Sequence, residues 1–200
     1  MSKTRYRTIF LGVLLSIGTT TALWAGPVLV LTPSAALSGW PAATLGWGFQ
    51  ITNDANYIEI TGASFCLDPV SFPACTLPTT GDFSDFISVY NDIIVGFPGG
   101  TLPASAQQPF DPIQLTGIGS FVIAPGAPIG APDVGAIVLT YDLYDLDPNN
   151  PLATNLARDL VFSANASVEV EAPEPATFGI LGLGLAGLAA FGRRGRRENL

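Results

Sequence analysis

The side chains that could do chemistry in this sequence are carboxylates, because it contains no His, the usual general base and a common metal ligand. Asp82, Asp85 and Asp92 lie around the aromatic residues Phe83, Phe86 and Tyr90. A pair of carboxylates is what hydrolysis of a glycosidic bond requires. Aspartates in loops rich in Gly and Ser are ordinarily solvated surface residues, however. We therefore predict no catalytic residue, and a polysaccharide-active hydrolase is the third and least favoured function that the sequence suggests.

A second group of oxygen ligands, Asp145, Asp147 and Asn149, has the i, i+2, i+4 spacing of calcium-binding loops. The pattern then fails at two positions, since Asn150 stands where Gly is expected and Leu156 where the bidentate Glu belongs. The alternative is an acidic turn leaving a strand, with the Asp-Pro-Asn-Asn run as the turn. Calcium is the one cofactor that the sequence suggests.

The composition excludes several classes of function. The chain has 200 residues, room for one ordinary domain, and only 12% of them are charged. Residues 26–172 hold 14 Asp and Glu but a single basic residue, Arg158, so their net charge is −13. No basic patch remains to hold phosphates, so we predict no nucleic-acid partner. Ser and Cys have no His or Lys base in this stretch, and we predict that the protein is not an enzyme.

The first 25 residues have the organisation of a signal peptide. Lys3, Arg5 and Arg7 precede nine apolar residues, Ile9–Ile17, and small and polar residues follow up to Ala25. This order directs export by the Sec machinery, with Ala25 as the predicted cleavage site and Ala22 as the alternative. The alternative, a buried N-terminal core helix, fits neither the flanking charges nor the short apolar length.

Export gives a meaning to Cys66 and Cys75, the two cysteines of the chain. An even number of cysteines in an oxidising compartment indicates a disulfide. Eight residues separate them, which is too many for a CxxC redox pair. A pair of free thiols is the alternative to the disulfide that we predict.

The end of the chain holds a second targeting segment. Thr177–Gly192 is 16 residues without a charge, which as a helix would span about 24 Å and fall short of the ~30 Å hydrocarbon core. Pro173-Glu174-Pro175 precedes this stretch, and two prolines keep a segment extended. A basic cluster follows it and would place the tail in the cytoplasm. The cluster consists of Arg193, Arg194, Arg196 and Arg197.

Pro-Glu-Pro followed by Ala176 and Thr177, a short span rich in Gly, Leu and Ala, and a terminal Arg cluster resembles the PEP-CTERM sorting signal. The resemblance implies a Gram-negative-type envelope and recognition by an exosortase, an integral membrane transpeptidase-like protease often encoded with exopolysaccharide genes. It also implies processing near Pro173–Thr177 at the inner membrane, and then release or attachment at the cell surface or in the extracellular matrix. A plain single-pass C-terminal anchor is the alternative.

Between the signal peptide and the C-terminal sorting signal, the sequence predicts one all-β domain. Pro and Gly make up about a fifth of residues 26–172, which breaks long helices, and short β-type runs recur between turn residues. Apolar and polar residues alternate along Leu160–Glu171, as in a half-buried strand. We predict a two-sheet antiparallel β-sandwich of the immunoglobulin-like type, with a surface loop at residues 124–132. The expected strands are Val28–Leu31, Thr44–Thr52, Tyr57–Cys66, Phe86–Tyr90, Ile113–Ile123, Gly135–Tyr144 and Leu160–Glu171.

The predicted organisation is thus a signal helix at residues 1–25, the β-sandwich domain at 26–172, and a sorting signal with a short transmembrane helix at 173–200. The function we favour is a non-enzymatic envelope or matrix protein, structural or adhesive, associated with exopolysaccharide in a biofilm. The second function, of a different class, is a β-sandwich module that binds carbohydrate or calcium.

Overall fold

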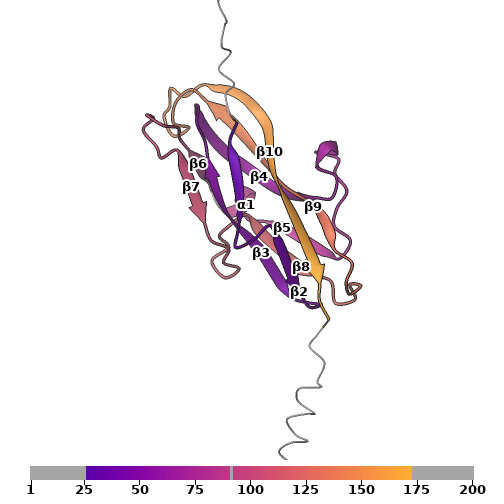
Figure 1. The fold of residues 1–200 in the computed structure, drawn as a ribbon. Helices are drawn as coiled ribbons and strands as arrows, with labels where there is room; N and C mark the ends of the chain where they lie inside the picture. Colours follow the sequence, from indigo (N-terminus) through magenta and orange to yellow (C-terminus); the bar gives the residue numbers. More distant parts are fainter. Residues whose placement is uncertain (1–25, 91, 173–200) are drawn as a thin grey trace, which may run out of the picture.

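The structure is a computed structural model that describes residues 26–90 and 92–172. These residues form two β-sheets with almost no helix (Figure 1). The first sheet contains β1 (Val28–Thr32), β3 (Thr44–Thr52), β5 (Gly81–Asp85), β7 (Ser105–Gln108) and β8 (Gly119–Ile123). The second contains β2 (Ala36–Gly39), β4 (Tyr57–Cys66), β6 (Ile93–Val95), β9 (Asp133–Tyr144) and β10 (Asn155–Val170).

The strand order joins segments that lie far apart in the sequence. The first sheet runs β1-β3-β8-β5, with β7 paired to β3, and the second runs β2-β10-β9-β4-β6. The predicted all-β class with two sheets is confirmed. The antiparallel prediction needs one correction, because β2 pairs with β10 in parallel. This pairing arises because the chain crosses between sheets after β1 and continues in the same direction.

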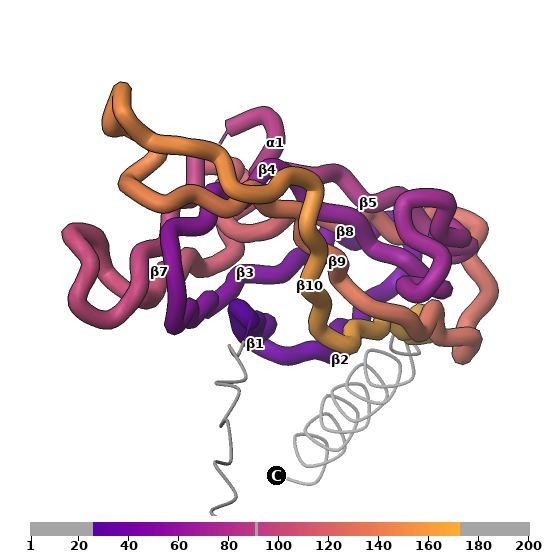
Figure 2. Tube along the Cα trace, turned by 90° about the horizontal axis from the view of Figure 1, so that it is seen from above, coloured from indigo at the N-terminus to yellow at the C-terminus, as the bar shows by residue number. Residues whose placement is uncertain are grey.

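The crossing from β1 to β2 links the two sheets along one side of the domain. β1 pairs with β3 in the first sheet, and after residues 33–35 the chain pairs with β10 in the second. Seen from above, β1 and β2 follow one another beside β10 (Figure 2). One short segment near the start of the domain therefore closes both sheets.

Aromatic side chains from both sheets meet in one core. Trp47 on β3 packs against Phe65 on β4 with ring centroids 5.4 Å apart, and Phe65 packs edge-on against Phe121 on β8 at 5.8 Å. All three side chains are buried. Along β10 the predicted alternation is confirmed, since Val168 and Val170 are buried whereas Glu169 is exposed. The core is thus formed by the inner faces of two sheets.

The strand predicted at Phe86–Tyr90 is wrong. Residues Ile87–Tyr90 form α1, a single helical turn closed by the hydrogen bond from the Tyr90 N–H to the Phe86 carbonyl. The carboxylate of Asp85 accepts a hydrogen bond from the Ile87 N–H at 2.8 Å and so caps this turn. The aromatic and β-branched residues that suggest a strand are here outweighed by the preceding cap.

The strand predicted at Ile113–Ile123 is also too long. Only Gly119–Ile123 is a strand, because Asp111 accepts hydrogen bonds from the N–H groups of Ile113 and Gln114 and turns the chain. The strands β2, β5, β6 and β7 had no counterpart among the predicted strands, since each is at most five residues long. The predicted loop at residues 124–132 is confirmed as a connection between β8 and β9.

The predicted signal helix (1–25) and transmembrane helix (173–200) lie outside the described residues. Within 26–90 and 92–172, no helix is long and apolar enough to cross a membrane.

Candidate functional site

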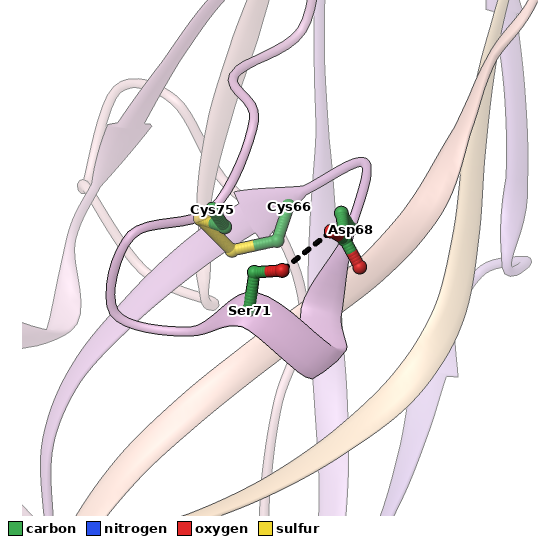
Figure 3. Close-up of a disulfide and its surroundings, with 4 residues drawn as sticks. All are labelled: Cys66, Asp68, Ser71 and Cys75. Carbon is green, nitrogen blue, oxygen red and sulfur yellow. Dashed lines mark hydrogen bonds between the residues drawn. A yellow bond between two sulfur atoms is a disulfide. The ribbon is translucent and has the colours of Figure 1, made fainter.

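A disulfide closes the loop that follows β4. Cys66, the last residue of β4, is bonded to Cys75, with their Cα atoms 5.4 Å apart, so the predicted pairing is confirmed. Inside the loop, the 3₁₀ turn η1 (Pro69–Ser71) is held by a hydrogen bond from the Ser71 hydroxyl to the Asp68 carboxylate (Figure 3). Beside the disulfide, the Leu67 N–H donates to the Thr76 carbonyl at 2.9 Å. The loop is therefore closed both covalently and by the backbone.

Replacing both cysteines tests how much this closure contributes. A loop of this length stabilises the folded state by about 2.7 kcal/mol in the chain-entropy treatment of cross-links. We expect Cys66→Ser/Cys75→Ser to lower the free energy of unfolding by that amount, measured by urea denaturation. Reduced wild-type protein is the matched control and should lose the same amount. Equal stability of the oxidised wild type and the double variant would contradict the prediction.

A buried carboxylate anchors the chain just beyond the disulfide. Asp133, the first residue of β9, is only 4% exposed. Its oxygens accept hydrogen bonds from the Thr79 N–H (2.9 Å) and hydroxyl (2.9 Å) and from the Thr80 N–H (2.8 Å) and hydroxyl (2.7 Å). Burial raises the pKa of Asp133, but the four hydrogen bonds stabilise the carboxylate and together lower the pKa by more than burial raises it. The pKa of Asp133 therefore lies below the ordinary value. Sequence reasoning missed this group, because its members are more than 50 residues apart.

The structure brings two of the three candidate carboxylates to one cleft. Asp82 and Asp85 on β5 line an opening of about 260 Å³ between β5 and β4, together with Phe83 and Ser64. Asp92 is not among the lining residues. Asp85 accepts hydrogen bonds from three backbone N–H groups, that of Ala63 on β4 at 3.1 Å and those of Ile87 and Ser88 in α1 at 2.8 and 3.5 Å. Asp85 thus links β5 to β4, which is a structural role, whereas Asp82 is exposed at the rim.

The candidate calcium residues lie in the loop between β9 and β10. The Asp147 carboxylate accepts hydrogen bonds from the backbone and side-chain N–H groups of Asn149, at 2.9 and 3.2 Å. Asp145 accepts one from the Thr154 N–H at 2.7 Å. These are the contacts of a polar turn. Among the described residues, no three of the types His, Cys, Asp or Glu are grouped so that they could hold a metal ion. Calcium binding at Asp145, Asp147 and Asn149 stays a prediction.

The end of β10 is where the described domain adjoins the C-terminal targeting segment. β10 is the longest strand of the described residues and ends at Val170 (Figure 1). Its last peptide unit is held on both sides. The Glu171 N–H donates to the Gly39 carbonyl at 2.8 Å, and the Val170 carbonyl accepts from the Gly130 N–H at 2.9 Å. Only Glu171 and Ala172 separate this strand end from Pro173.

The residues that follow the end of β10 belong to a known sorting motif. The PEP-CTERM protein-sorting motif matches residues 171–197. The predicted residues Pro173–Thr177 and the basic cluster Arg193, Arg194, Arg196 and Arg197 all fall within the match. The resemblance is therefore confirmed: residues 171–197 carry a PEP-CTERM sorting motif, which implies export with a membrane-anchored sorting signal and processing by an exosortase.

Further comparisons add little about the domain itself. No curated protein matches the chain. One solved structure, a family 123 glycoside hydrolase from Clostridium perfringens described in a study of glycolipid glycan hydrolysis, is similar with 8% identity and a TM-score of 0.29. The similarity covers 76% of this chain but only 28% of that hydrolase. A likeness this low carries no argument about function.

Proposed function

We propose that the domain is a non-enzymatic structural or adhesive component that an exosortase delivers to the cell surface or the extracellular matrix, where it associates with exopolysaccharide. The observation that carries the proposal is that the sorting motif directly follows the last strand of the domain. The last strand ends at Val170 and the sorting motif begins at residue 171. With no linker or further domain between them, processing near Pro173–Thr177 would release the sandwich with its fold untouched.

The chemistry of the described residues supports a passive role. Of the two carboxylates in the cleft between β4 and β5, Asp85 is occupied by backbone N–H groups. The most buried carboxylate, Asp133, is likewise saturated by hydrogen bonds from Thr79 and Thr80. General acid–base chemistry needs a group free to exchange protons with a substrate, and neither carboxylate offers this.

One observation favours the second function, a module that binds carbohydrate. The cleft between β4 and β5 combines the exposed carboxylate of Asp82 with the partly buried ring of Phe83 and the Ser64 residue. Polar groups beside an aromatic surface suit a sugar. Incubating the processed protein with exopolysaccharide separates the three functions. Retention without release of reducing ends supports a carbohydrate-binding module, and release of reducing ends supports a hydrolase. Absence of both supports a structural component whose domain has no glycan-binding site of its own.

We also propose that the sandwich is of the immunoglobulin-like type. The neighbours β1-β3-β8-β5 correspond to the A-B-E-D order of that fold, and β10-β9-β4 to its G-F-C order. The chain departs from the type in two respects. β5 precedes β6 in the sequence although β6 extends the G-F-C sheet, and β7 pairs with β3 outside the A-B-E-D order.

Mass spectrometry of the intact protein tests the sorting function. In cells that make an exosortase we expect the chain to end between Pro173 and Thr177, whereas cells that lack it should retain the Arg-rich tail. The matched variant replaces Pro173, Glu174 and Pro175 with alanine and should keep its tail in both strains. A tail retained in both strains by the unmodified protein would instead make it a permanently anchored surface or periplasmic domain.

A further inference from the structure

Two exposed apolar side chains flank the point where the chain leaves the domain. Trp40 follows Gly39, whose carbonyl accepts the Glu171 N–H, and Trp40 is 57% exposed. Ile129 precedes Gly130, whose N–H donates to the Val170 carbonyl, and Ile129 is 58% exposed. Since the N–H and C=O of one peptide unit point in opposite directions, Gly39 and Gly130, the neighbours of these two residues, lie on opposite sides of the exit.

The turn that presents Trp40 is strained. The Ala43 N–H donates to the Trp40 carbonyl at 3.0 Å and closes a turn with Pro41 and Ala42 at its centre. Ala42 has φ = 68°, a left-handed conformation that suits Gly and is unfavourable for a residue with a Cβ atom. Strain of this kind persists where the surroundings enforce it and is common at functional surfaces. The turn is also tied to β8, because the Ala42 N–H donates to the Ile123 carbonyl, so the backbone that carries Trp40 is held in place.

The short length of chain beyond the exit places this end of the domain close to the membrane. Thr177, the first residue of the uncharged stretch, lies six residues beyond Glu171. Six residues reach at most about 20 Å even when fully extended. While the sorting motif is anchored in the membrane, the exit end is therefore confined to within about that distance of the bilayer. Tryptophan is enriched at membrane–water interfaces because one part of its ring system is apolar and its N–H is polar.

The charge at the exit end of the domain indicates which kind of lipid surface this end can approach. Glu169 and Glu171 are exposed beside the exit, and the one basic residue of the domain, Arg158, lies near the opposite end of β10. An anionic surface would repel these carboxylates. A zwitterionic lipid surface would not, and it accepts the apolar side chains of Trp40 and Ile129.

We propose that Trp40 and Ile129 dock the exit end of the domain into the headgroup region of a zwitterionic bilayer while the sorting motif is anchored there. This docking rests on the proposed function only in requiring the membrane-anchored motif. It holds Pro173-Glu174-Pro175 at the membrane surface, where an integral membrane protease can reach it.

Quenching of tryptophan fluorescence by brominated lipid tests the docking. The chain from Gly26 to Leu200 has two tryptophans, Trp40 and Trp47, and Trp47 is fully buried. In phosphatidylcholine vesicles with brominated acyl chains, we expect loss of most of the Trp40 emission relative to unbrominated vesicles. Trp40→Phe should abolish this loss, and replacing half of the lipid with anionic phosphatidylglycerol should reduce it.

A matched control places the probe at the other end of the domain. Leu152 is 78% exposed in the loop before β10, and β10 spans roughly 50 Å at the usual rise per residue. Leu152→Trp in the Trp40→Phe background should show no quenching by brominated lipid. Equal quenching at both ends would overturn the proposal, because it indicates nonspecific adsorption.

Flotation of the same vesicles separates the two failures. If the chain floats with the lipid but Trp40 is not quenched, the motif is anchored and the docking is wrong. If the chain does not float, the sorting motif does not anchor it in the membrane, and the proposed docking is wrong as well. If Trp40 is unquenched in lipid but becomes shielded from iodide when an exosortase is added, its partner is the enzyme, which also overturns docking on lipid.

Discussion

Replacing Trp47 with alanine is expected to lower the free energy of unfolding by about 3–5 kcal/mol, the range measured for large aromatic truncations in cores. Trp47 is fully buried and contacts Phe65 on β4 and Phe83 on β5, so its ring joins both sheets. Its indole N–H also faces the Ala35 carbonyl at 3.4 Å, in the crossing between β1 and β2. Domains are stable by only about 5–15 kcal/mol in total, so this one change removes a large share.

Urea denaturation of Trp47→Ala measures this loss, and Trp40→Ala is its matched control. Trp40 is 57% exposed, so its truncation should change the free energy of unfolding by less than about 0.5 kcal/mol, as surface substitutions do. If the two variants lose similar stability, then Trp47 does not bridge the sheets as described.

The second large effect concerns Asp133 and depends on pH. Its pKa in the folded protein is lowered by the hydrogen bonds from Thr79 and Thr80, whereas the unfolded chain has the ordinary value near 4. The carboxylate therefore contributes stability at pH values above about 4, and this contribution is lost as the pH falls through the lower, folded-state pKa. At pH 7 we expect Asp133→Asn to cost about 2–3 kcal/mol, because the N–H donors lose a charged acceptor and face an amide.

Urea denaturation at pH 7 and at pH 3 checks both the size and the sign. The difference between wild type and Asp133→Asn should shrink at pH 3, because the unfolded chain then binds a proton at this carboxyl more readily than the folded state, whose pKa is lowered. Asp54→Asn, at an exposed position in the turn between β3 and β4, provides the comparison and should show no such change. A difference that is the same at both pH values would show that the charge of Asp133 is unimportant.

Long strands with a clear pattern were predictable, and short ones were not. The bounds predicted for β3 and β4 agree with the structure, because both are long runs of apolar and β-branched residues between turns. β2 and β7 are only four residues each and carry few apolar side chains. Their pairing depends on neighbours distant in the sequence, β10 and β3, so no local pattern could reveal them.

The chemistry was predictable only where it is local. The disulfide follows from two cysteines in an exported chain, and the sorting motif from a contiguous pattern. The network of Asp133 with Thr79 and Thr80 joins residues brought together only by the fold. Likewise, nothing in the sequence around Trp40 places it beside Glu171, because their proximity comes from the parallel pairing of β2 with β10.

That parallel pairing also sets an order of events during export. β2 and β10 are the first and last strands of the second sheet to cross the membrane, and the paired residues Ala36 and Ser167 are 131 positions apart. Contacts so distant in the sequence form late, since the loop between them must first be closed. The sheet cannot acquire its outermost strand until Val170 has been translocated, and the next residue already belongs to the sorting motif. The second sheet can therefore be completed only after the whole chain up to the first residue of the sorting motif has crossed the membrane.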